Sequence, residues 1–488
     1  MKKRIITIFT CISSIVLYTG CNSLLDVAPV SSITSANYWK TEGDVAGYLT
    51  GTYESYRDAI NTTYYMEDRG DAFEPGLEAG LSTPWTQNLT ESGAPNWDKM
   101  YKVIHSCNLL LKYGESISFS EQAAKNRIMA ETRFLRASAY FFLIRIWGKA
   151  PLITAPTEND HVLMPARAPL NDVMGQVLTD IDAALTLFPE EGYKNKGRAS
   201  KPATLALKAD VLLWKAKVLK GGNADLEAAM DAADKASAGL ALEENFWKIY
   251  ATDNRKGKEV IFAIHFNKDE KVGSDNSVRN HYSSQLKPRD LFVQNATNKN
   301  SIAFSKKYAR SSYSPSVKLE NLYLKNPDDK RLDEAIIKAL APDGTVMGRF
   351  DNKMRGTNYA NDDRYYDSDI IIYRLAEMIL FKAEALAALN RVPEAVAALN
   401  KVRARAGIAA YAGAQEKIAV EKEILDERFR ELYLELKRWP DLFRFHAGGS
   451  INVYQEVPNL AGKQTPLYFP IPRPQIDLNP NLEQTEGY

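Results

Sequence analysis

IIIYRLAEMILFKAEAL, residues 370–386, decides the fold class, because it is apolar on most sides, as expected of a helix buried between neighbouring helices. A second helix is predicted to follow, with Pro393 in its first turn and Gly407 at its end. A third helix is predicted to run until Pro440 ends or kinks it. Three consecutive helices over residues 369–445 predict a helical scaffold.

The third helix is predicted to have one apolar and one polar face. Its apolar positions are separated by four, three and four residues and are Leu425, Phe429, Leu432 and Leu436. Its polar positions are Glu427, Glu431, Glu435 and Arg438. Because this spacing suits ion pairs on a helix surface or hydrogen bonds between helices, we expect a structural role rather than acid–base catalysis.

Length and composition describe an ordinary folded protein. A chain of 488 residues can bury a large core, and 25% charged and 45% hydrophobic residues argue against disorder. The formal net charge is +1, from 62 basic and 61 acidic residues. This balance gives no electrostatic case for nucleic acid or for an anionic surface as a partner.

The N-terminus has the features of an export signal with a lipid-attachment site. Residues 1–20 hold three basic residues and then an apolar run too short to span a bilayer comfortably. The ending Thr19-Gly20-Cys21 resembles a bacterial lipobox, in which cleavage precedes the cysteine and Cys21 is acylated, although Tyr18 stands where an aliphatic residue is usual. We expect residues 21–35 to form a lipid-anchored tether. The alternative is an ordinary secretory signal with an incidental cysteine.

Cysteine and histidine usage predicts neither disulfides nor a metal site. Cys11 leaves with the signal and Cys21 carries lipid, so Cys107 has no partner and is expected to be a small buried residue on a helix. The five histidines are scattered without metal-ligand spacing. The sequence also lacks a phosphate loop and a dinucleotide fingerprint, so we expect no cofactor.

The remaining chain divides into two helical parts and an insertion. Residues 36–244 predict an N-terminal helical scaffold, interrupted at residues 61–96 by a loop rich in Gly, Pro, Asp and aromatic residues that is a candidate for function. Residues 245–368 predict an inserted, loop-rich lobe with short strands, and residues 369–488 return to helices and end in an extended, Pro-rich tail. Helices are expected over residues 43–59, 97–113, 121–147, 170–188 and, as a pair, 201–238, and a strand over residues 260–264.

Two helix pairs share a spacing of small residues. Within the segments Trp214–Leu219 and Phe381–Leu386, Ala216 and Ala383 each lie twelve residues before a small residue, in the Ala228 region and at Ala395. Small residues let antiparallel helices approach closely, as in tetratricopeptide (TPR) units. We therefore expect a mostly α, TPR-like scaffold of helix pairs. The alternative is two helix pairs with coincidental alanines.

Six groups of residues stand in a characteristic order between Cys21 and Tyr488. The first group is Trp97, Tyr101, Ile104 and Asn108, which are separated in the chain. The others are Glu131-Thr132-Arg133-Phe134-Leu135-Arg136-Ala137 with Trp147-Gly148; Arg374-Leu375-Ala376-Glu377 with Lys382-Ala383-Glu384-Ala385; Leu399-Asn400 with Arg405-Ala406-Gly407; Glu427-Arg428 with Arg438-Trp439; and Phe469-Pro470-Ile471-Pro472 with Gly487-Tyr488. In this order they resemble the SusD/RagB family of outer-membrane nutrient-binding lipoproteins of Bacteroidota.

The resemblance implies a protein that is lipid-anchored in the outer membrane and faces the cell exterior. It implies binding of an oligosaccharide or a similar nutrient, and delivery to a SusC-like TonB-dependent transporter, without catalysis. One alternative is an all-helical glycoside hydrolase, which needs two carboxylates about 5–10 Å apart, such as Asp68 and Asp71. Another is a helical-repeat scaffold that binds only protein.

A glycan site needs exposed aromatic rings for the C–H faces of sugars, interleaved with polar groups for their hydroxyls. Two segments have this composition, and family members bind ligand through loops of similar placement. The candidate residues are Asp68, Arg69, Asp71 and Trp85 in the first segment and Tyr282, Tyr308 and Tyr313 in the inserted lobe. Trp85, in a polar setting, is the best single candidate for a stacking platform.

Overall fold

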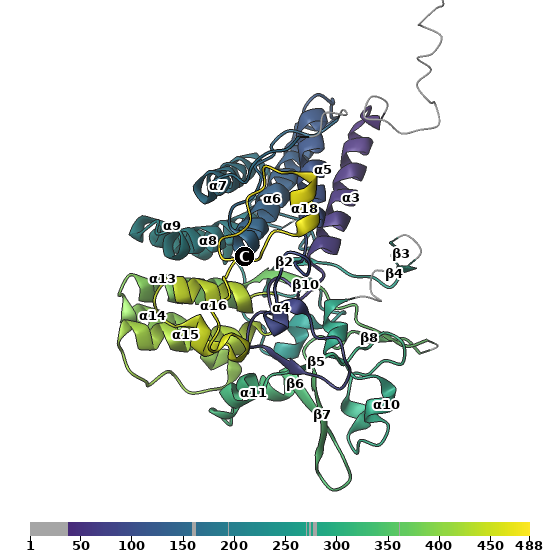
Figure 1. Ribbon diagram of the computed structural model, residues 1–488, viewed down its shortest axis with the longest axis vertical. Helices are drawn as coiled ribbons and strands as arrows, with labels where there is room; N and C mark the ends of the chain where they lie inside the picture. Colours follow the sequence, from purple (N-terminus) through teal and green to yellow (C-terminus); the bar gives the residue numbers. More distant parts are fainter. Residues whose placement is uncertain are drawn as a thin grey trace, which may run out of the picture.

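The computed structural model describes residues 38–488, apart from residues 159–162, 194, 270, 273–274, 277–280 and 361. The predicted export signal, the tether and Cys21 lie outside these described residues. Figure 1 shows a body of helices with a lobe of short strands and irregular chain at one end. This arrangement confirms the predicted mostly α fold with a loop-rich insertion.

The N-terminal part consists of helices whose bounds agree closely with the predicted ones. They are α3 (Glu42–Ile60), α5 (Asp98–Gly114), α6 (Gln122–Trp147), α7 (Leu170–Leu187), α8 (Lys201–Val218) and α9 (Asn223–Ala236). The short helix α4 (Thr83–Thr86) is not among the predicted helices and lies within residues 61–96, which the sequence predicts to be a loop. Thr41 caps α3 through a capping box with Asp44, and Ser200 caps α8. Nearly all of α6 from Met129 onward is buried, so its apolar sequence belongs to the core as predicted.

The C-terminal helices complete a stack of helix pairs. They are α13 (Leu375–Ala388), α14 (Val392–Ala406), α15 (Lys417–Leu432), α16 (Arg438–Ala447), α17 (Val453–Glu456) and α18 (Arg473–Leu478). Helix α6 packs on α7, α8 on α9 and α13 on α14, and α13 also packs on α9, so the pairs follow one another along one side of the molecule (Figure 1). Ala395 is buried as the repeat predicts, whereas Ala228 is exposed and its neighbour Ala229 is buried instead.

The helix predicted over residues 370–386 begins later than expected. Ile370–Arg374 forms strand β10, which pairs antiparallel with β2 (Val260–Ile264), and α13 starts only at Leu375. The prediction is therefore wrong for these first 5 residues. Three consecutive Ile residues favour a strand, and a strand buried on both faces is as apolar as a buried helix, so periodicity cannot separate the two.

The third predicted helix is two helices. Helix α15 ends at Leu432, and α16 begins at Arg438. Between them Leu434 and Leu436 adopt positive φ angles of 61° and 62°, and both are buried. Pro440 therefore lies in the first turn of α16, where a missing N–H is tolerated, and the prediction that it ends or kinks a helix is wrong.

Buried ion pairs centred on Glu431 join the inserted lobe to the scaffold. Glu431 pairs with Arg331 of the lobe (2.8 Å), Arg374 of β10 (2.6 Å) and Arg405 of α14. Burial alone raises the pKa of Glu431, but the three guanidiniums hold it well below its usual range. The structural role predicted for Glu431 is confirmed, although its ion pairs lie in the interior and not on a helix surface.

The inserted lobe is built from short antiparallel ribbons and short helices. These elements are β3 (Lys271–Val272), β4 (Asp275–Asn276), β5 (Tyr313–Pro315), β6 (Ile336–Leu340), β7 (Val346–Asp351), β8 (Thr357–Asn358), β9 (Arg364–Tyr365), α10 (Asp290–Val293), α11 (Val317–Leu324) and α12 (Leu332–Ala335). Strand β6 pairs with β7 and β8 with β9, but β5 pairs with β1 (Phe73–Pro75) of the N-terminal part. The lobe is thus tied to the candidate loop at residues 61–96.

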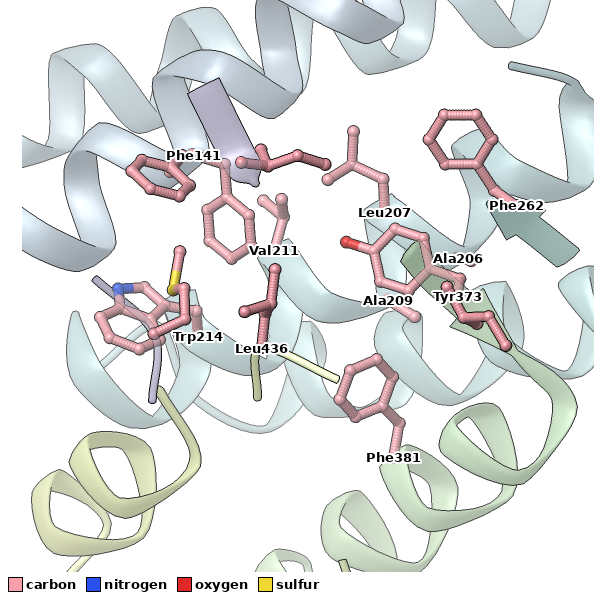
Figure 2. Packing of buried hydrophobic residues seen from close by; sticks show 14 of the residues in the cluster. Phe141, Ala206, Leu207, Ala209, Val211, Trp214, Phe262, Tyr373, Phe381 and Leu436 are labelled. Carbon is pink, nitrogen blue, oxygen red and sulfur yellow. The ribbon is translucent and has the colours of Figure 1, made fainter. Parts of the chain in front are cut away.

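The C-terminal tail and the core close the molecule. The Pro-rich tail lies extended over the body, where the Phe469 N–H donates to the Ile146 carbonyl (2.8 Å), and α18 lies beside α5 through a hydrogen bond from Gln475 to Asp98 (2.6 Å). Figure 2 shows part of the core, in which buried side chains of α6, α8, β2, β10 and α13 and Leu436 belong to one cluster. The labelled residues include Phe141, Leu207, Val211, Trp214, Phe262, Tyr373 and Phe381.

Candidate ligand-binding site

Three candidate residues of the loop at residues 61–96 are buried. Asp68, Arg69 and Asp71 are 1%, 0% and 4% exposed. Asp71 accepts hydrogen bonds from Nε and Nη2 of Arg438 (2.5 and 2.8 Å) and pairs with Lys318 (2.7 Å). Burial alone raises the pKa of Asp71, but these cations lower it to about 2. The expectation that these three side chains are exposed is wrong.

Arg69 fixes the C-terminal tail and does not face solvent. Its Nη1 and Nη2 donate to the carbonyls of Leu467 (2.6 Å) and Pro466 (2.9 Å), and its guanidinium carbon lies 4.4 Å from the ring centroid of Trp439. Because these partners lie almost 400 positions away in the chain, the loop composition gave no sign of them. Arg69 therefore acts as a structural clamp.

The structure brings the two candidate segments together. Strand β1 pairs with β5, and the Tyr313 hydroxyl donates to Asp68 (3.1 Å), which also accepts from the Ser82 hydroxyl (2.6 Å). Tyr313 and Tyr282 are 1% and 3% exposed, and the Tyr282 hydroxyl donates to the Leu434 carbonyl (2.7 Å). Both tyrosines are framework residues at this junction, and the expectation that they are exposed is wrong.

Trp85 is only partly buried. It lies in the short helix α4, whose start is capped by Ser82, and its indole Nε1 donates to the Phe73 carbonyl (3.1 Å). Asn459 also donates to the Trp85 carbonyl (2.9 Å), so hydrogen bonds hold both the ring and the backbone of Trp85. Trp85 thus keeps an accessible part of its ring in a fixed orientation, and its role as a stacking residue stays a prediction.

The inserted lobe presents three tyrosines, Tyr308, Tyr359 and Tyr365, which we call the tyrosine platform. The ring centroids of Tyr308 and Tyr365 are 4.6 Å apart at an interplanar angle of 38°, and Tyr359 meets Tyr365 edge-on at 5.6 Å. Tyr308 and Tyr359 are partly exposed, whereas Tyr365 is buried against them. The platform therefore offers aromatic surface to solvent on a rigid support.

Polar groups adjoin the tyrosine platform. The Tyr365 hydroxyl donates to Asp362 (2.7 Å), and the Tyr359 hydroxyl donates to Asp367 (3.0 Å). The hydrogen bond from Tyr365 lowers the pKa of Asp362, so this exposed carboxylate is ionised at neutral pH. Lys268 Nζ lies 5.0 Å from the Tyr359 ring centroid. The site thus combines ring faces with a carboxylate acceptor and an ammonium donor.

Asp363 fixes the loop that carries Tyr308. Its Oδ2 accepts hydrogen bonds from the Ser305 hydroxyl (2.9 Å) and from the backbone N–H groups of Lys306 (3.0 Å) and Lys307 (2.8 Å). Its Oδ1 accepts from the backbone N–H of Arg364 (2.8 Å) in strand β9. Because one buried carboxylate holds both segments, the platform is pre-organised before any ligand arrives.

Of the candidate residues in the lobe, only Tyr308 belongs to the tyrosine platform. The candidates omitted Tyr359, Tyr365, Asp362 and Asp363. The available signal is the run Asp362-Asp363-Arg364-Tyr365-Tyr366, which interleaves carboxylates, a guanidinium and aromatic rings as a glycan site requires. Its pairing with residues 305–308 depends on a long-range contact that no local pattern reveals.

Other site chemistry has little support in the described part of the chain. No group of three or more His, Cys, Asp and Glu is placed to hold a metal ion among the described residues. No helix in those residues is long and apolar enough to cross a membrane. Cys107 is buried on α5, as predicted, and burial raises the pKa of its thiol.

Comparison with known proteins identifies the family. Residues 24–213 match a family model described as starch-binding and associating with the outer membrane, and residues 340–488 match the model of the SusD family. SusD-like protein P38 of Formosa agariphila is 28% identical over 530 residues, which cover 100% of this chain and 99% of that protein. The chain belongs to the SusD/RagB family. Its resemblance to that family, found in the sequence, is confirmed.

Other SusD/RagB proteins agree over nearly the whole chain. The starch-binding protein SusD of Bacteroides thetaiotaomicron is 26% identical over 96% of this chain and 96% of its own. The structure of NanU from Bacteroides fragilis superposes with a TM-score of 0.80 at 27% identity, covering 95% of this chain and 100% of that one. SusD/RagB proteins are starch- and glycan-binding proteins that associate with the outer membrane, and the TPR-like helical fold is shared.

Proposed function

We propose that this protein binds an oligosaccharide, or a similar nutrient, at the cell surface and delivers it to a SusC-like TonB-dependent transporter. The observation that carries the proposal is the tyrosine platform, which presents partly exposed rings beside ionised and hydroxyl groups on a pre-organised loop. Sugars offer C–H faces to aromatic rings and hydroxyls to such polar groups. Membership of a glycan-binding family supports the same reading.

The same geometry favours binding without catalysis. A glycoside hydrolase needs two accessible carboxylates on opposite sides of the scissile bond. Asp68 and Asp71, the pair that could supply them, are buried, and Asp71 is engaged by Arg438 and Lys318. We therefore assign no hydrolytic activity to this pair.

Calorimetry against a panel of oligosaccharides, with chromatography of each mixture after prolonged incubation, tests this function. The proposal expects saturable binding of at least one oligosaccharide and recovery of that sugar uncleaved. Cleavage products would favour the hydrolase alternative. Absence of binding across the panel, together with capture of a protein partner, would favour the protein-binding scaffold.

We further propose that acylated Cys21 anchors the mature protein in the outer membrane, facing the exterior. Thr19-Gly20-Cys21 after an apolar run motivates this proposal, and several acyl chains give firm anchoring. Metabolic labelling with a fatty acid should mark the wild type and not Cys21→Ala. Equal labelling of both would contradict it.

The transporter partner is tested by purification from membranes in mild detergent. A complex with a large outer-membrane barrel is expected to copurify with the lipid-anchored protein. Repeated recovery of the monomer alone would contradict the delivery step while leaving glycan binding intact.

A further inference from the structure

The formal charge of the whole chain is near zero, but basic and acidic residues are unevenly distributed between the inserted lobe and the rest of the chain. Residues 245–368, the inserted lobe, contain 22 Lys and Arg against 16 Asp and Glu, a formal charge of +6. The other residues of the mature chain, 21–244 and 369–488, contain 37 Lys and Arg against 45 Asp and Glu, a formal charge of −8. The lobe that carries the tyrosine platform is therefore the basic part of an otherwise acidic protein.

Part of this positive charge lies beside the tyrosine platform. Lys306, Lys307 and Arg310 are exposed and flank Tyr308 in the chain. Lys307 Nζ lies 3.4 Å from Asp362, the carboxylate that also accepts the Tyr365 hydroxyl. Lys268 adds a fourth cation over the face of Tyr359.

Among the described residues, Lys307 pairs with Asp362 (3.4 Å) and Lys268 with Asp269 (2.8 Å), whereas the other two cations of this set have no acidic partner. Within the described part of the chain, neither Lys306 nor Arg310 has a carboxylate within ion-pair distance. The buried carboxylate of Asp363 accepts hydrogen bonds from the backbone N–H groups of Lys306 and Lys307, so it fixes the loop without pairing with either ammonium group. Asp363 therefore holds the backbone of the loop in place, while the side chains of Lys306 and Lys307 remain exposed.

We propose that the ligand bound at the tyrosine platform is an acidic sugar chain, whose carboxylate or sulfate groups pair with Lys306, Lys307 and Arg310. This proposal rests on the glycan-binding function proposed above and narrows its ligand class. A neutral glycan is recognised by rings and by hydrogen-bonding groups, and an excess of one charge adds no net attraction for it. An anionic chain does gain, because Lys306 and Arg310 have no acidic partner among the described residues and need not release one to bind it.

Salt dependence distinguishes the two ligand classes. Exposed charges more than about 10 Å apart are screened at about 0.1 M salt, so electrostatic attraction weakens as salt rises. Stacking of a neutral sugar on the rings is insensitive to salt in that range. The affinity for an acidic ligand is therefore expected to fall with added sodium chloride, and the affinity for a neutral ligand is not.

The test is calorimetry with a short oligogalacturonide, a sulfated heparin oligosaccharide and neutral malto-oligosaccharide, each at low and high salt. The variant Lys306→Glu/Lys307→Glu reverses the charge at the site and keeps the backbone hydrogen bonds to Asp363. The control variant Lys102→Glu/Lys401→Glu makes the same charge change at exposed positions of α5 and α14. Circular dichroism checks that both variants fold.

The expected result is that one or both acidic probes bind, that the site variant weakens their binding about tenfold or more, and that the control does not. Binding of the neutral probe alone would overturn this inference and leave the proposed function standing. Equal loss in both variants would also overturn it, because the effect would then be one of net charge. If none of the three probes binds but anionic lipid vesicles do, the basic lobe serves a membrane surface and the inference fails.

Discussion

Replacing Glu431 by Gln tests whether the buried ion pairs hold the lobe to the scaffold. Glu431 is 0% exposed and is shared by three guanidiniums that come from the lobe, from β10 and from α14. Glu431→Gln removes the negative charge but keeps the shape of the side chain. Every loss of stability then reports the charge and not a cavity.

The expected loss of stability depends on the ion pairs that each guanidinium retains in the variant. Arg331 still pairs with Asp329 (2.8 Å), and Arg374 and Arg405 still pair with Glu259 (2.6 and 3.0 Å), so none of the three charges is left alone. Breaking a buried pair usually costs about 3–5 kcal/mol, because a buried charge loses compensation. With three arginines affected and each still partly compensated, we expect a loss of about 3–5 kcal/mol in the free energy of unfolding.

Urea titration followed by circular dichroism measures this loss, with the m-values of wild type and variant compared to check that the same transition is observed. The matched control is Glu394→Gln, which removes an ion pair with Arg391 in which both side chains are exposed. Exposed pairs contribute little, so its midpoint should equal that of the wild type. If Glu431→Gln shifts the midpoint no more than Glu394→Gln does, the reasoning is refuted.

Three further predictions concern stability and the ligand. Burial alone raises the pKa of Glu427 and of Glu435, but their arginine and lysine partners lower each pKa to about 2, below the value of about 4.3 in an unfolded chain. Their contribution to stability is therefore present above about pH 4.5 and lost as the pH falls toward 2, and a melting temperature that stays constant over that window would contradict the assignment. Phe134→Ala removes a ring that is 0% exposed and 5.1 Å from the ring of Phe262, and should cost about 3–5 kcal/mol; an unchanged urea midpoint would contradict its place in the core. Trp85→Ala should weaken glycan binding at least tenfold, about 1.4 kcal/mol, with the circular dichroism spectrum preserved; unchanged affinity in calorimetry would remove Trp85 from the site.

The helices could be predicted because their signals are local. Apolar periodicity, caps and stop residues lie within the segment that they define, as in α14, where Pro393 and Gly407 mark both ends. The prediction is wrong at β10 for the opposite reason. Apolar periodicity does not separate a buried strand from the first turn of a buried helix, and the pairing with β2 that decides between them is not local. The break between α15 and α16 likewise depends on Leu434 and Leu436, which adopt left-handed backbone conformations. Because neither residue is a glycine, the sequence gives no local signal for this break.

The candidate site could be predicted only as a region. Composition singled out two segments, and the structure joins them through β1 and β5. It could not say which polar side chains face inward, because the partners of Asp71 and Arg69 are Arg438 and the tail carbonyls, which lie hundreds of positions away. A polar residue in a loop has the same appearance in sequence whether its partner is solvent or a distant buried cation.

The most direct test of the glycan-binding claim is calorimetry on Tyr308→Ala/Tyr359→Ala with the oligosaccharide that the wild type binds most tightly. Tyr411→Ala, at a partly exposed tyrosine of the scaffold, is the matched control. The tyrosine platform predicts at least a tenfold loss of affinity, about 1.4 kcal/mol, in the double variant and none in the control. Wild-type affinity in a correctly folded double variant would contradict the account.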